Sequence, residues 1–165
     1  MSTHSQSVKQ LNQLGVEHHL AGHLPQAAEI YRQALELEAD NATTHNNLGF
    51  LLAQSEQLEQ ALEHLRRAVQ LDPTLANAHA NLGQVLSLLG NQNAAQTHLI
   101  RATDLQPENP QNWYNLGRIR LLAGKSPKAI SALQQAAKMQ PQNAFFLREL
   151  SKAHGLNGDY QHALD

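Results

Sequence analysis

The stretch Trp113-Tyr114-Asn115-Leu116-Gly117 decides the fold, because its Leu-Gly pair returns along the chain at a fixed interval. Towards the N-terminus, the glycine recurs at Gly83, Gly49 and Gly15, always after the same number of residues. We call this constant spacing along the sequence the repeat interval. Alanines and prolines follow the same repeat interval, at Ala27, Ala61, Ala95, Ala129 and Ala163 and at Pro73, Pro107 and Pro141. Three independent series with one period indicate a repeat architecture built from stacked supersecondary units.

The composition allows a packed core and argues against several classes of protein. Apolar residues make up 41% of the 165 residues but aromatic residues only 4%, so alanine and leucine must fill most of the core. A net charge of −2 gives no indication of nucleic-acid or membrane binding. The sequence has no cysteine, no recognisable signal peptide and no apolar run near the ~20 residues that span a bilayer, so a cytoplasmic location is expected.

Each unit, about 34 residues long, is expected to form a first helix, a short turn and a second helix. Residues 1–7 are expected to be a disordered lead. The predicted units cover residues 8–41, 42–75, 76–109 and 110–143, followed by a partial fifth unit over 144–165.

Glycine has two predicted roles within a unit. Gly90 and Gly124 suit the tight turn between the two helices, where unit two has Glu56 instead. Gly117 falls inside a first helix, where glycine costs ~1 kcal/mol relative to alanine. Gly117 and Ala129 are the smallest residues at matching positions of their two helices, so we expect these helices to cross closely.

The unit resembles the tetratricopeptide repeat family. In unit four the family's signature positions hold Trp113, Leu116, Gly117, Ala129, Ala136 and Pro141, whereas His45 and His79 replace the tryptophan in units two and three. The resemblance covers about residues 8–165. It implies an all-α protein: a right-handed α-solenoid, or superhelix, of antiparallel helix pairs, whose first helices line a concave groove where peptides or partner proteins commonly bind.

A row of asparagines is the strongest candidate for ligand binding in this groove. Asn47, Asn81 and Asn115 are separated by the repeat interval, each directly before the leucine of a Leu-Gly pair. A side-chain amide both donates and accepts hydrogen bonds, so a stacked row would pair with the backbone of an extended peptide. Asparagine ladders of this sort recur in the tetratricopeptide family. The alternative is that these amides bond only to neighbouring helices or solvent.

Further candidate residues flank the asparagines on the same face. They are Phe50, Gln84, Arg118 and Lys152, again separated by the repeat interval, with Asn77, Gln111, Tyr114 and Arg148 beside them. The groove would be neutral and partly apolar in the early units and basic near Arg118, Arg148 and Lys152, which favours a ligand with an acidic side chain or a terminal carboxylate. Charge along the chain follows the same trend. Residues 1–82 carry four basic and nine acidic side chains, whereas residues 83–165 carry eight basic and five acidic ones.

No catalytic residue, metal site or cofactor is predicted. The sequence has no phosphate-binding loop, dinucleotide-binding glycine motif or Gly-x-Ser-x-Gly. Among its histidines, His45 with His79 and His64 with His98 are separated by the repeat interval. Equivalent positions on adjacent units are ~10 Å apart, too far for one ion with ~2 Å bonds.

Three functions remain open at this point. The first is a non-catalytic protein–protein interaction module that holds an extended peptide or partner protein in its groove. The second is the substrate-presenting portion of a larger enzyme of the glycosyltransferase, sulfotransferase or hydroxylase type. The third is a self-assembling scaffold: the partial fifth unit would leave Leu147 and Leu150 without a capping helix, and a second copy would cover them.

Overall fold

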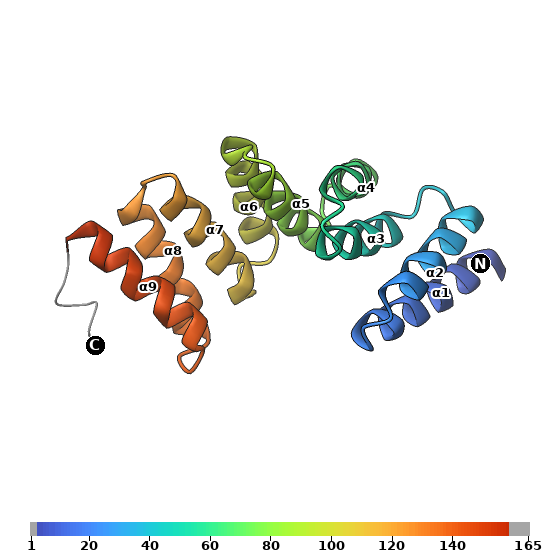
Figure 1. The fold of residues 1–165 in the computed structure, drawn as a ribbon, viewed down its shortest axis with the longest axis horizontal. Coiled ribbons are helices and arrows are strands. Elements are labelled where there is room, and N and C mark those ends of the chain that lie inside the picture. Colours follow the sequence, from blue (N-terminus) through green and yellow to red (C-terminus); the bar gives the residue numbers. More distant parts are fainter. Residues whose placement is uncertain (1–2, 159–165) are drawn as a thin grey trace.

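The computed structural model describes residues 3–158, with the side chains of residues 6–125 and 127–158. Over these residues the chain forms nine α-helices and no strand (Figure 1). The helices are α1 (Thr3–Leu20), α2 (Leu24–Leu37), α3 (Ala42–Gln54), α4 (Leu58–Leu71), α5 (Ala76–Leu88), α6 (Gln92–Leu105), α7 (Pro110–Leu122), α8 (Ser126–Met139) and α9 (Ala144–Asn157).

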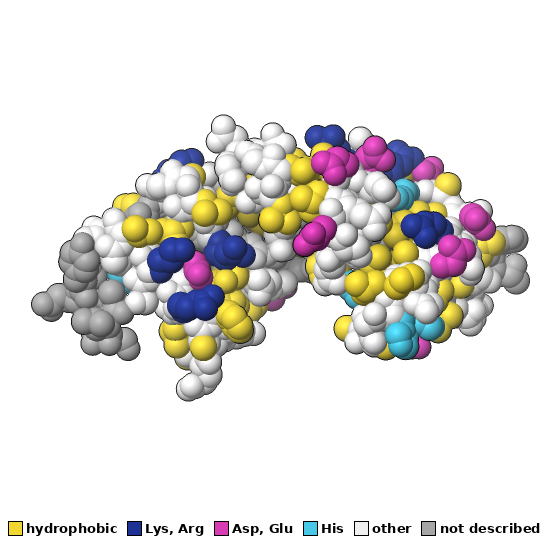
Figure 2. All heavy atoms as spheres, viewed as in Figure 1, with side chains coloured by type: hydrophobic (Ala, Val, Ile, Leu, Met, Phe, Trp, Pro, Cys, Tyr) yellow, Lys and Arg dark blue, Asp and Glu magenta, His cyan; other side chains and the backbone are white. Residues whose placement is uncertain are grey.

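The helices form a row of hairpins rather than a bundle around one centre. α1 packs on α2, α3 on α4, α5 on α6 and α7 on α8, and each hairpin also packs on the next. The first helices of neighbouring units touch directly as well, α3 with α5, α5 with α7 and α7 with α9. The row bends, so its two ends stand on either side of an opening (Figures 1 and 2). The fold is therefore an all-α solenoid.

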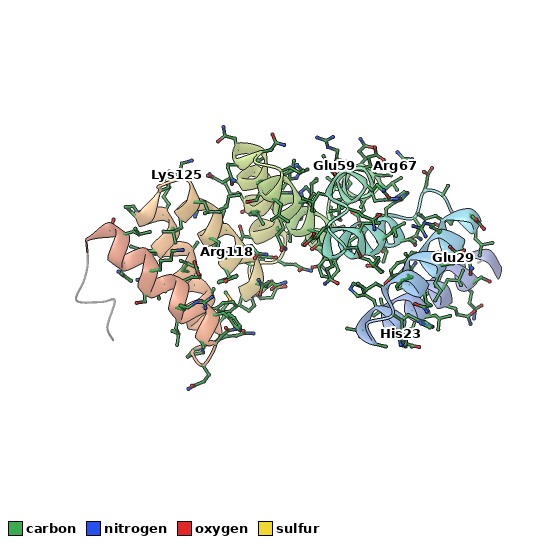
Figure 3. The ribbon with its side chains drawn as sticks, viewed as in Figure 1. His23, Glu29, Glu59, Arg67, Arg118 and Lys125 are labelled. Atoms are coloured by element: carbon green, nitrogen blue, oxygen red, sulfur yellow. The ribbon has the colours of Figure 1, made fainter. Side chains whose placement is uncertain are left out.

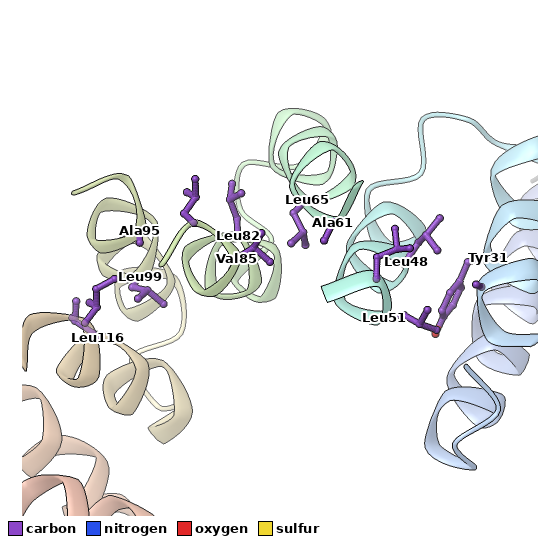
Figure 4. Packing of buried hydrophobic residues seen from close by; sticks show 14 of the residues in the cluster. Tyr31, Leu48, Leu51, Ala61, Leu65, Leu82, Val85, Ala95, Leu99 and Leu116 are labelled. Atoms are coloured by element: carbon purple, nitrogen blue, oxygen red, sulfur yellow. The ribbon is translucent and has the colours of Figure 1, made fainter. Parts of the chain in front are cut away.

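The apolar core follows the row from one hairpin to the next. Buried side chains from α2 to α7 form a continuous series, which runs from Tyr31 through Leu48, Leu65 and Leu82 to Leu116 (Figure 4). One cluster thus contains side chains from successive units, as expected for a repeat protein in which each unit packs on its neighbours. This packing fixes the pitch at which the first helices follow one another.

The mid-helix glycines allow the two helices of a hairpin to approach closely. A Cβ atom added to Gly83 would lie 2.7 Å from Leu99 Cγ and 3.1 Å from the backbone oxygen of Ala95. The same contact recurs at Gly49 and at Gly117, where the nearest atom is again the Cγ of a leucine on the second helix. The close crossing expected at Gly117 is confirmed, and a buried leucine makes the contact.

The turns between the helices of a pair use a left-handed residue. Gly22, Gly90 and Gly124 have φ values of 78°, 82° and 69°, which confirms the turn predicted for the last two. Glu56 takes the same place in unit two with φ of 60°. A residue with a Cβ atom is strained in the left-handed backbone conformation, so unit two has the least favourable of these turns.

The N-terminal boundary differs from the expected one. Residues 3–7 belong to α1 and do not form the disordered lead expected over residues 1–7. Val8 is 1% exposed, and no proline or glycine interrupts the residues before it, so the helix continues upstream of its first buried side chain. Residues 1–2, and residues 159–165 with the second helix expected in unit five, lie outside the described residues.

Candidate functional site

Three clefts lie along the first helices α3, α5, α7 and α9. The α3/α5 cleft has a volume of about 140 Å³, the α5/α7 cleft about 110 Å³ and the α7/α9 cleft about 340 Å³. Because neighbouring first helices are in contact, the three clefts follow one another along one face of the solenoid. An elongated ligand would cross them in sequence.

The structure brings six of the predicted site residues into these clefts. They are Phe50, Asn81, Gln84, Asn115, Arg118 and Lys152. The other five predicted residues line none of the three clefts; they are Asn47, Asn77, Gln111, Tyr114 and Arg148. Sequence reasoning missed the leucines of the clefts, Leu88, Leu122 and Leu156. The signal for them was present, because these leucines too are separated by the repeat interval.

Asn115 lies at the α5/α7 cleft with half of its amide unsatisfied. The residue is 6% exposed, and its Oδ1 accepts a hydrogen bond of 3.0 Å from Gln111 Nε2. Its Nδ2 is buried without a hydrogen-bond partner. A buried donor without an acceptor costs about 1–3 kcal/mol, so this amide gains from a ligand that supplies an oxygen.

The other two asparagines of the row are tied to the protein by a fourth. Asn46 Oδ1 accepts a hydrogen bond of 3.0 Å from Asn81 Nδ2, and Asn46 Nδ2 donates over 3.2 Å to Asn47 Oδ1. Asn46 is 7% exposed and was not among the predicted site residues. The three amides are therefore not equivalent: the Nδ2 donor of Asn81 is already engaged, as in the alternative explanation of the row, whereas that of Asn115 is not.

Basic side chains gather over α7 and α9. Figure 2 shows dark blue side chains over this part of the molecule, and Figure 3 labels Arg118 there. Arg118 and Lys152 line the α7/α9 cleft together with Glu149. The Arg118 guanidinium carbon lies 5.7 Å from the centre of the Tyr114 ring, an arrangement typical of a cation–π contact. Within residues 3–158, no ion pair joins Glu149 to either cation. This end of the face keeps a net positive charge.

Trp113, His79 and His45 occupy the same place in their units and make the same hydrogen bond. Trp113 Nε1 donates to the backbone oxygen of Pro107 over 2.7 Å, and His79 Nε2 lies 3.1 Å from that of Pro73. His45 Nε2 makes the equivalent contact of 2.9 Å with the backbone oxygen of Ala39. Histidine therefore replaces the tryptophan by keeping its N–H donor.

A second histidine fills the space that the indole occupies in unit four. His64 Nδ1 lies 2.9 Å from His45 Nδ1, and His98 Nδ1 lies 3.0 Å from His79 Nδ1. Since the first histidine of each pair donates through Nε2, its Nδ1 accepts, and the second histidine donates. The equivalent residue beside the tryptophan is the buried Ala132. We call these two contacts the histidine pairs.

The histidine pairs form within a unit and not between units. His45 and His79 hold equivalent positions on adjacent units, but each lies against a histidine of its own hairpin. Burial is the largest cause that lowers the pKa of all four side chains. Over the part of the chain that the structure describes, no group of three or more histidine, cysteine, aspartate or glutamate side chains is arranged to hold a metal ion.

The fold and its row of clefts define a class of protein, an α-solenoid of helix hairpins that presents one continuous face. Family models identify it further. The model described as TPR repeat matches residues 15–55 and 51–90, and the model described as tetratricopeptide repeat matches residues 80–144 and 120–165. The chain belongs to the tetratricopeptide repeat family, whose members are generally non-catalytic protein-interaction modules.

Solved structures of this family share the fold. MamA is 25% identical with a TM-score of 0.80, over 91% of this chain and 88% of MamA. The pilF protein of Pseudomonas aeruginosa is 22% identical with a TM-score of 0.89, over 98% of this chain and 74% of that protein. YrrB, described as a TPR protein with an unusual peptide-binding site, is 18% identical with a TM-score of 0.76, over 99% of this chain and 88% of YrrB.

No curated protein sequence matches the chain. Among the helices of residues 3–158, none combines the length and the apolar character needed to cross a bilayer.

Proposed function

We propose that the chain binds an extended segment of a partner protein along the three clefts and catalyses no reaction. The observation that carries this proposal is the unpartnered Nδ2 of Asn115, which is buried at a cleft that solvent-exposed leucines border. A backbone carbonyl of an extended peptide supplies the oxygen that this donor needs. The leucines beside it, Leu88 and Leu122, offer apolar surface to the side chains of the same peptide.

Charge at the C-terminal end of the face supports an acidic ligand. Arg118 and Lys152 border the α7/α9 cleft, and Arg118 also lines the α5/α7 cleft. Arginine pairs well with a carboxylate, because its planar guanidinium offers two parallel N–H donors. A peptide that places a carboxylate over α7 and α9 would therefore bind more tightly than a neutral one.

Replacing Asn115 by alanine tests the proposal. Peptides are first selected from a displayed random library against the whole chain, and the best binder is synthesised with a fluorescent label. Asn115→Ala should raise its Kd about 2- to 10-fold, as expected for the loss of one net hydrogen bond. The free energy of unfolding should stay level or rise, because the substitution removes a buried donor that has no acceptor.

Two variants complete this experiment. Asn93→Ala, on the exposed side of α6, is the matched control and should leave the Kd unchanged. Arg118→Glu should weaken an acidic binder, and less so at high salt, because exposed charges are screened over about 10 Å at 0.1 M. Unchanged affinity in both Asn115→Ala and Arg118→Glu would mean that the partner binds elsewhere.

A further inference from the structure

Three exposed leucines run parallel to the asparagines along the face. Leu88, Leu122 and Leu156 lie near the C-terminal ends of α5, α7 and α9, and they are 67%, 68% and 63% exposed. We call them the leucine row. One exposed leucine needs no explanation, but three at one position of successive units form an apolar stripe of the kind that marks an interaction surface.

The leucine row borders every one of the three clefts. Leu88 lines the α3/α5 and α5/α7 clefts, Leu122 lines the α5/α7 and α7/α9 clefts, and Leu156 lines the last. The row does not continue into unit two, where the equivalent residue is Gln54, hydrogen-bonded to His19 over 2.7 Å. Apolar contacts are therefore offered once per unit over the C-terminal half of the face.

The spacing of the row restricts the conformation of the ligand. Packed helices lie about 8–10 Å apart, so the leucines recur at about that interval. A polyproline-II segment has three residues per turn and rises about 3.1 Å per residue, so every third side chain returns to one face after about 9 Å. Same-face side chains of a β-strand recur after only about 7 Å, which does not match. Side chains seven residues apart lie on one face of an α-helix and are separated by about 10.5 Å, so a helical ligand also fits the spacing of the leucines.

The polar groups of the clefts decide between the helix and the polyproline-II segment. Carbonyls inside a helix accept hydrogen bonds from their own chain, whereas polyproline II leaves all of its carbonyls free. Asn115 Nδ2, buried and unpartnered beside Leu88 and Leu122, needs such a carbonyl. The α3/α5 and α5/α7 clefts, at about 140 and 110 Å³, are each of a size to take a single side chain of the ligand.

We propose that the ligand is an extended segment of polyproline-II type, with an apolar side chain at every third position and a carboxylate over the α7/α9 cleft. This rests on the proposed function and adds the spacing, the conformation and the charge of the ligand. The leucine row binds the apolar side chains, Asn115 binds a carbonyl between them, and Arg118 with Lys152 binds the carboxylate.

Two synthetic peptides of identical composition test the spacing. Both contain three leucines and a pair of glutamates on a background of proline, glutamine and alanine. One peptide places a leucine at every third position and the other at every second position. Each is made in two versions, with the pair of glutamates at the N-terminal end or at the C-terminal end. The peptide with every third position apolar, in its better orientation, should bind the whole chain at least about tenfold more tightly by fluorescence anisotropy.

Variants of the leucine row test the contact surface. Leu122→Gln should raise the Kd of the better peptide by about tenfold, because one apolar side chain is no longer buried. Leu20→Gln is the matched control: Leu20 holds the equivalent position in unit one, is 83% exposed and borders none of the three clefts. It should leave the Kd unchanged. Circular dichroism melting of both variants checks that they fold.

The outcomes separate this inference from the proposed function. Equal affinity of the two peptides, no binding of either, or no effect of Leu122→Gln overturns the inference. If Asn115→Ala still weakens a library-selected binder in that case, the proposed function stands. Sedimentation velocity gives a third result: a dimer that Leu122→Gln dissociates would show that a second copy covers the leucine row, which also overturns the inference.

Discussion

Replacing Gly83 by alanine should destabilise the solenoid although alanine is the better helix former. In an open helix position the change would stabilise by about 1 kcal/mol. At Gly83 the new Cβ atom would meet Leu99 Cγ at 2.7 Å and the backbone oxygen of Ala95 at 3.1 Å. Leu99 is 2% exposed and the Ala95 oxygen belongs to the backbone of α6, so we expect α5 and α6 to move apart.

The size of the effect follows from two opposing contributions. Overpacking of a dense core costs about 1–3 kcal/mol, and contact with a backbone atom places this site in the upper part of that range. After the gain of about 1 kcal/mol in helix propensity, we expect a net loss of about 1–2 kcal/mol. For a chain of this length, the melting temperature should fall by about 2–4 °C for each kcal/mol.

Gly155→Ala is the matched control. Gly155 also lies inside a helix, α9, but a Cβ atom there would meet nothing within 4 Å. Urea unfolding followed by circular dichroism should show no loss for Gly155→Ala and a lower midpoint for Gly83→Ala. In a Leu99→Ala background, the substitution at Gly83 should cost less, because the contact with Leu99 Cγ is gone and only that with the Ala95 oxygen remains. If Gly83→Ala were as harmless as Gly155→Ala, the close crossing of the two helices would not be what requires the glycine.

Three further predictions concern the turn of unit two and the histidine pairs. Glu56→Gly should raise the free energy of unfolding by about 0.5–1 kcal/mol, because it relieves a left-handed residue; a decrease would show that no strain is present there. His79→Trp combined with His98→Ala copies the arrangement of Trp113 and Ala132. In a double-mutant cycle, the double variant should be more stable than the sum of the two single effects by about 0.5–3 kcal/mol. Additive effects would contradict the idea that the indole takes the space of the second histidine. The pKa values of the histidine pairs are lowered in the folded state, so the unfolded chain binds more protons in acid. The free energy of unfolding should therefore be fully retained above the ordinary histidine pKa of 6.5 and be lost as the pH falls through the folded values. Urea titrations in chelator at about pH 7.5 and about pH 5.5 measure this loss, which should be smaller in the double variant.

Most of the fold was present in the sequence, because a repeated unit reports the same structural requirement several times. The glycine at one position of each first helix predicted the close crossing, and Gly90 and Gly124 predicted the turns. The phase of the first helices also placed Gln84 and Arg118 on the face that carries the clefts. An α-helix turns by a constant angle per residue, so the sequence alone determines which side chains share a face.

Which neighbour each polar side chain binds was decided only by the tertiary structure. Asn46 engages Asn81 of the next unit, and His45 meets His64 of its own hairpin, both between helices whose relative position the period does not give. A hydrogen bond tolerates only a few tenths of an ångström and needs a correct direction, whereas the period gives a face and a pitch. The same limit explains why three asparagines that look equivalent in the sequence differ in the folded chain, and why, of these three, Asn115 is the one whose Nδ2 is buried without a hydrogen-bond partner.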